Sequence, residues 1–168
     1  METPIENKVE KANIKQIDLG DFTNKQPILI FDLEPGLWQG MAIKEKEFRA
    51  FVKNTDWANF ENKTVGIICS ADAIIPAWAF MLVTTQLKNV NANLFFGNKT
   101  QVEELIFFKQ LNQINILKYT NERVMVKGCS NIPNPNRAYT ELTELLVPVV
   151  KSLMFGEPCS AVPIYKNK

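Results

Sequence analysis

The sequence predicts an α/β fold, with a mostly parallel central sheet, helices on both faces and an antiparallel hairpin at one edge. From residue 64 onward, short apolar runs alternate with longer segments whose apolar residues recur at helical spacing. The short runs are continuously apolar, which is typical of parallel strands covered on both sides. Ahead of them, Glu34-Pro35-Gly36 separates two apolar runs and predicts the turn of the hairpin.

The individual elements follow from local pattern. Residues 1–26 have no clean periodicity, and we expect a loosely attached N-terminal arm there. No linker or low-complexity stretch divides residues 27–168, so we expect a single α/β domain. Pro148 should kink the last helix. Strands are predicted at 28–33, 37–43, 64–68, 92–96 and 123–126, and helices at 44–55, 76–87, 101–113 and 135–155.

Composition excludes several classes of function. The 168 residues are 46% hydrophobic and 22% charged, with a net charge of +1 and scattered lysines and arginines, so we expect no nucleic-acid partner. The longest apolar run, residues 73–83, contains a proline and is too short to span a membrane. The polar start lacks the apolar stretch of a secretory signal, and we expect a cytoplasmic protein. Histidine is absent, which removes Ser-His and Cys-His pairs and imidazole metal ligands.

Every cysteine is followed by serine: Cys69-Ser70, Cys129-Ser130 and Cys159-Ser160. The first two pairs each follow an apolar strand and precede a short loop, a proline and a predicted helix. In parallel α/β sheets, ligands bind outside the carboxyl ends of the strands. We therefore predict one site at that edge, with the sulfurs of Cys69 and Cys129 within about 8 Å of each other, close enough for one metal centre.

Neighbouring residues could serve this predicted site. Ser70 and Ser130 lie in the two cysteine loops, and Asn98 ends another strand at the same edge. Lys127 could add positive charge, and Trp78 and Tyr139 could roof the site. A helix N-terminus behind Cys69 and Cys129 would favour their thiolate forms, so rapid alkylation is expected.

Cys159 is harder to place. A straight helix over residues 135–155 would span about 30 Å, against about 17 Å for a five-residue strand, and would leave Cys159 at the opposite edge of the sheet. We predict that the Pro148 kink and the Gly156-Glu157-Pro158 turn return it to the site, or that a second subunit supplies it.

Simpler interpretations stand beside these. A cysteine closing an apolar strand can be a small buried hydrophobe. Ser70 and Ser130 could cap helices. Trp78 and Tyr139 have the spacing of core residues, and Lys127 could be a solvated charge.

The segments FDLEPGLWQGMAIKEKEFRAFVKNTDW, ICSADAIIPAWAFML, VKGCSNIPNPNRAY and FGEPCSAVPIYK resemble the bacterial family catalogued as domain of unknown function 2480. The resemblance covers nearly the whole chain and carries no activity over to it. It implies iron–sulfur assembly proteins as partners, because genes of this kind often lie near iron–sulfur assembly genes.

Three functions remain open. The leading hypothesis is a protein that binds zinc or an iron–sulfur cluster through Cys69, Cys129 and Cys159, because thiolates without imidazole select zinc, copper(I) or iron–sulfur clusters over magnesium or calcium. Three thiolates would leave one coordination position open. The second is a thiol-based enzyme or sulfur carrier with Cys129 or Cys69 as nucleophile. The third is a non-catalytic homodimeric interaction module whose cysteines are structural.

Overall fold

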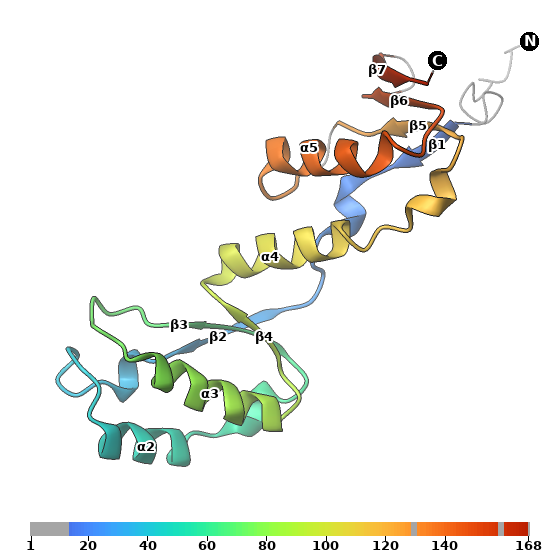
Figure 1. Ribbon diagram of the computed structural model, residues 1–168. Helices are drawn as coiled ribbons and strands as arrows, with labels where there is room; N and C mark the ends of the chain where they lie inside the picture. Colours follow the sequence, from blue (N-terminus) through green and yellow to red (C-terminus); the bar gives the residue numbers. More distant parts are fainter. Residues whose placement is uncertain (1–13, 129–130, 158–159, 168) are drawn as a thin grey trace, which may run out of the picture. The chain divides into compact units, whose positions relative to one another are not determined.

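The computed structural model describes residues 14–128, 131–157 and 160–167 (Figure 1). Its contacts divide the chain into two compact units, Asn24–Leu105 and a unit formed by Met1–Thr23 with Ile106–Lys168. The fold is α/β and mostly parallel, with an antiparallel hairpin at one sheet edge, as the sequence predicts. The strands form two sheets, however, where one central sheet was expected. Each unit is described by itself below.

The unit Asn24–Leu105 is built on a parallel sheet of three strands. In the order in which they pair, these are β2 (Ile28–Asp32), β3 (Thr64–Ile68) and β4 (Asn93–Phe96). Ile28 pairs with Thr64, and Thr64 pairs with Asn93. The carboxyl ends of all three strands therefore meet at one edge.

Helices cover both faces of this sheet. Helices α2 (Glu45–Asn54) and α3 (Ala77–Asn89) bury one side of each against the face that carries Val65 and Ile67 (Figure 1). Gly66 points to the opposite face, because successive strand residues alternate. There a Cβ atom would come within 2.9 Å of Val102, in the first part of α4 (Lys99–Leu111).

The other unit is built on a sheet of four strands in the order β1, β5, β6, β7. The first three are parallel, and β7 runs antiparallel to β6. Helix α5 buries Ala138, Leu142 and Leu146 against Val124 and Leu153 of the sheet. The elements are β1 (Ile14–Ile17), β5 (Arg123–Val126), α5 (Pro135–Leu146), β6 (Ser152–Phe155) and β7 (Val162–Lys166).

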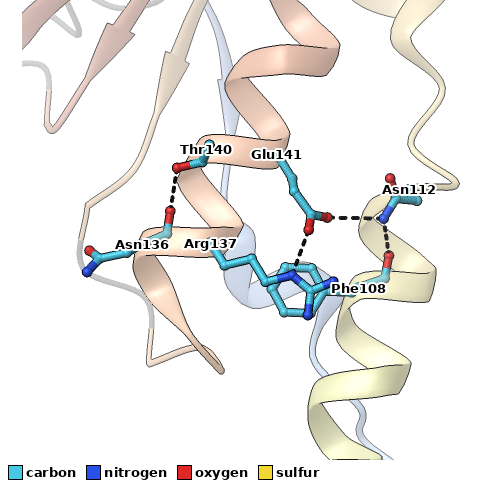
Figure 2. A network of polar contacts seen from close by, with 6 residues as sticks. All are labelled: Phe108, Asn112, Asn136, Arg137, Thr140 and Glu141. Carbon is cyan, nitrogen blue, oxygen red and sulfur yellow. Dashed lines mark hydrogen bonds and ion pairs between the residues drawn. The ribbon is translucent and has the colours of Figure 1, made fainter.

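A polar network joins the last turns of α4 to α5 (Figure 2). The Arg137 guanidinium lies 3.7 Å from the centre of the Phe108 ring, and its Nε donates to Glu141 at 2.7 Å. The Asn112 side chain donates to the other Glu141 oxygen at 3.3 Å and to the Phe108 carbonyl at 2.8 Å. The bond from Arg137 is the main reason that the pKa of Glu141 lies below its ordinary value; the bond from Asn112 and the Arg137 charge also lower it, against partial desolvation.

The predicted hairpin over residues 28–43 is wrong. Residues 28–32 do form a strand, but it pairs in parallel with β3. After the short 3₁₀ turn Glu34–Gly36, the expected second strand is reduced to isolated bridges: Trp38 pairs antiparallel with Ala42, and Ala42 pairs parallel with Ile74. The antiparallel hairpin of the fold is the β6–β7 pair at the other end of the chain.

The predicted helix over residues 135–155 is half right. Helix α5 ends at Leu146, and Ser152–Phe155 forms β6. Pro148 ends the helix instead of kinking it, because proline lacks the N–H that the next turn needs and its ring crowds the preceding turn.

The N-terminal arm predicted over residues 1–26 contains ordered structure. Residues 14–17 pair with β5 as strand β1, and Ile17 and Leu19 are buried. Within the described ranges, no helix is both long enough and apolar enough to cross a membrane.

Candidate functional site

The carboxyl edge of the four-stranded sheet is shaped by two glycines. The Gly156 N–H donates to the Val126 carbonyl at 2.9 Å, and its φ of +115° suits glycine. A Cβ atom on Gly156 would lie 2.9 Å from the Ser160 carbonyl oxygen, and one on Gly128 would lie 2.9 Å from the Phe155 ring. Gly128, Gly156 and Ser160 therefore lie together where β5 and β6 end.

These residues are the neighbours in sequence of two predicted ligands. Cys129 follows Gly128, and Cys159 precedes Ser160. Cys129, Ser130 and Cys159 themselves lie outside the described residues. The described flank of Cys159 is at the same edge as Gly128 because β6 runs parallel to β5. Helix α5 ends at Leu146, so it is not long enough to carry the chain to the other edge of the sheet, as a helix over residues 135–155 would.

Lys127 has partners within its own unit. Its ammonium nitrogen lies 3.4 Å from an Asp18 carboxylate oxygen, and its carbonyl accepts a hydrogen bond from the Tyr139 hydroxyl at 3.1 Å. Through these two contacts, Lys127 holds the loop after β5 against Asp18 and Tyr139. The Lys127 ammonium group and the Asp18 carboxylate form an ion pair. No local pattern in the sequence indicates Asp18 as a partner of Lys127, because the two residues are 109 positions apart.

Cys69 lies at the carboxyl edge of the three-stranded sheet. The side chain is partly buried against the apolar core of its unit, and its thiol donates to the Ala71 carbonyl at 3.7 Å. Helix α3 begins only at Ala77. Residues 70–76 separate Cys69 from this helix, which agrees with the predicted loop and proline, and the rapid alkylation of Cys69 stays a prediction.

Asp32 is a residue that sequence reasoning missed. One of its carboxylate oxygens accepts the N–H groups of Ser70 and Glu34, each at 3.0 Å. Desolvation alone would raise the pKa of Asp32, but hydrogen bonds from the Ser70 side chain and from these two N–H groups bring it below its ordinary value. Asp32 is the last residue of β2, and Cys69 directly follows the last residue of β3. Their matching positions at the ends of two apolar strands are the sequence feature that could have identified Asp32.

Asn98 has a structural role. Its side chain accepts the Gln101 N–H at 3.0 Å, and the Gln101 side chain accepts the Asn98 N–H at 2.8 Å. This reciprocal arrangement caps the start of α4. The side-chain oxygen of Asn98 is thus engaged in the cap.

The two aromatic residues expected above the site pack into cores, as the simpler interpretation had it. Trp78 meets Phe48 edge to face at 5.8 Å, and Tyr139 meets Phe155 edge to face at 5.2 Å. Trp78 belongs to one unit and Tyr139 to the other.

A common site for all three cysteines stays a prediction. Cys69 follows a strand of one sheet and Cys129 follows a strand of the other. The expected 8 Å separation involves Cys129, which lies outside the described residues. Among the residues that the structure does describe, no group of three cysteine, aspartate or glutamate side chains could hold a metal ion.

The protein is thus an α/β protein in which Cys69 and Cys129 follow parallel strands in the sequence. Residues 3–167 match the family described as protein of unknown function (DUF2480), and the chain belongs to that family. No curated protein and no solved structure matches the chain.

Proposed function

We propose that the protein binds a zinc ion or an iron–sulfur cluster through thiolates at the carboxyl edge of the four-stranded sheet, with Cys129 and Cys159 as ligands. The observation that supports this most directly is the position of their described neighbours. Gly128 and Ser160 lie at one edge, Gly128 beside the Phe155 ring and Ser160 beside Gly156. Because Cys129 is bonded to Gly128 and Cys159 to Ser160, the position of these neighbours supports a shared site for the two thiolates.

The chemistry of the available donors supports the same metals. The chain has three cysteines and no histidine, and soft thiolates favour zinc and iron–sulfur clusters over magnesium or calcium. Two thiolates do not complete a tetrahedral centre. Cys69, a second copy of the chain or an iron–sulfur assembly partner would supply the remaining ligands.

The test is metal analysis of the full-length protein purified without oxygen, with zinc, iron and acid-labile sulfide measured per chain. Cys129→Ser and Cys159→Ser should each weaken metal binding by at least about tenfold, because each removes a thiolate ligand. Ser160→Ala keeps all thiols and should retain the wild-type content. Circular dichroism confirms that each variant is folded.

Two results would overturn the proposal: a wild-type protein without bound metal, or a Cys159→Ser variant with full occupancy beside a depleted Cys129→Ser variant. Cys69→Ser distinguishes a site in which Cys69 is a ligand from a site in which it is not. Loss of metal in that variant makes Cys69 a third ligand, and full occupancy limits the site to Cys129 and Cys159.

A further inference from the structure

A cavity of about 270 Å³ lies between α5 and the β6–β7 hairpin. Tyr139, Leu142 and Thr143 line it from the helix, Phe155 lines it from β6, and Ile164 lines it from β7. The edge-to-face pair of Tyr139 and Phe155, with ring centres 5.2 Å apart, lends it an aromatic surface. Leu142 is fully buried, whereas Ile164 is 51% exposed, so Ile164 lies at the solvent side of the cavity.

The two side-chain hydroxyls among the described lining residues already have partners. The Tyr139 hydroxyl donates to the Lys127 carbonyl at 3.1 Å, and the Thr143 hydroxyl donates to the Tyr139 carbonyl at 2.7 Å. None of the described lining residues is charged. A ligand here would gain little from a polar group and would lose the hydration of a charged one.

The β6–β7 ladder beside this cavity is irregular. Leu153 pairs with Tyr165 and Met154 pairs with Pro163, which leaves Ile164 as an extra residue on β7. Such a bulge redirects side chains and locally bends the strand. Protein interiors are otherwise close-packed, and apolar cavities accept apolar molecules.

We propose that this cavity is a binding site for a small uncharged ligand, or for the uncharged end of a larger one, of the size of a single aromatic ring or a short branched alkyl group. Its volume is below the range of sites for drug-sized molecules, which limits the occupant to about one ring. The apolar lining selects against a carboxylate or phosphate on the buried end. This site is independent of any metal held by the cysteines.

The probe for this site is 4-fluorotoluene, observed by ¹⁹F NMR while full-length protein is added. We expect saturable broadening and a shift of the fluorine signal. The charged analogue 4-fluorobenzoate has a ring of the same size and should bind at least about tenfold more weakly, because its carboxylate would be desolvated without a partner. Absence of saturable binding of 4-fluorotoluene, or equal binding of the two probes, would overturn the proposal.

Two variants of the same strand locate the binding. Ile164→Trp should fill the solvent side of the cavity and abolish the broadening and shift of the 4-fluorotoluene signal. Val162→Trp is the matched control, because Val162 is also on β7, is 54% exposed and is not among the described lining residues. It should bind as the wild type does. Equal effects of both substitutions would contradict the assignment, and Ile164→Phe repeats the comparison if the larger side chain prevents folding.

Discussion

Asp32 joins two loops through one carboxylate. It accepts N–H groups from the loop after its own strand and from the loop after β3, and those hydrogen bonds lower its pKa. A group whose pKa is lower in the folded protein stabilises the fold above its unfolded pKa, near 4. That contribution is lost as pH falls through the folded pKa.

Asp32→Ala should therefore reduce the free energy of unfolding by about 1 kcal/mol at neutral pH, a modest value because the cluster is open to solvent. The difference from wild type should be constant between pH 6 and 8, as an approximate plateau, and shrink below about pH 4. Urea unfolding at several pH values measures it. The control is Asp72→Ala, an exposed carboxylate in the loop after β3, which should change little. A pH-independent difference would contradict the assignment to the charged carboxylate.

Arg137 combines a charge-assisted hydrogen bond with stacking on Phe108 (Figure 2). Arg137→Lys keeps the charge but loses the planar group, and should reduce the free energy of unfolding by about 1 kcal/mol. Arg49 provides a matched control: it bonds Glu45 at 2.8 Å with the same helical spacing, but lies 5.9 Å from the centre of the Trp78 ring. Thermal unfolding should therefore show a smaller effect for Arg49→Lys. Equal effects would mean that stacking on Phe108 adds nothing.

At the scale of elements, the contact between β3 and the start of α4 depends on Gly66. A Cβ atom there would lie 2.5 Å from the Gly97 carbonyl oxygen and 2.9 Å from Ile30 and Val102. The backbone oxygen cannot turn away as a flexible side chain can. A larger residue would thus push α4 and the loop before it off the sheet.

Gly66→Ala should cost about 1–3 kcal/mol of unfolding free energy, the usual range for overpacking a filled interior. The measurement is urea unfolding followed by circular dichroism. Asn93→Ala, at an exposed position on the neighbouring strand β4, controls for alanine substitution in the same sheet. A Gly66→Ala protein as stable as wild type would show that the loop at Gly97 shifts freely.

At the scale of the whole molecule, the aromatic residues report on the two units separately. All three tryptophans, at positions 38, 57 and 78, lie in Asn24–Leu105, and all three tyrosines, at 119, 139 and 165, lie in the other unit. Buried residues of α4 serve both cores: Val102 packs beside Gly66, and Phe107 belongs to the core under α5.

The single domain expected over residues 27–168 stays a prediction, and these chromophores test it. We expect the tryptophan emission and the tyrosine near-ultraviolet absorbance to change at the same urea concentration, because disrupting α4 removes buried residues from both cores. Gly66→Ala should then shift both transitions together. Separate midpoints, with only the tryptophan transition moved by Gly66→Ala, would show two independently unfolding units.

Local pattern predicted much of the fold. The strands at 64–68 and 123–126 were placed correctly, and the helices α2, α3 and α4 were found within two residues of their bounds. Strand β6 was missed because Ser152–Phe155 continues an apolar segment that suits a helix as well as a strand. Strand β7, which pairs with it, was missed as well. Strand β1 was missed because Ile14–Ile17 is short and its two apolar residues do not alternate with its two polar ones.

The candidate site was predictable only in part. The Cys-Ser repeats marked three loops, and the described neighbours of two of them lie together at one sheet edge. The partners of Lys127 and Ser70 could not be found in the same way. Asp18 and Asp32 are 109 and 38 positions away, and nothing in the local sequence couples such distant residues.

The sequence by itself determined the α/β class, most of the local elements and the positions of the three Cys-Ser pairs. These follow from periodicity, proline and glycine, which act over a few residues. Only the tertiary structure decided which strands share a sheet, as when Ile14 pairs with Arg123. Every residue type except proline offers the same backbone donor and acceptor, so an apolar strand can pair with many others. The choice among them is made by how the side chains pack once distant segments meet.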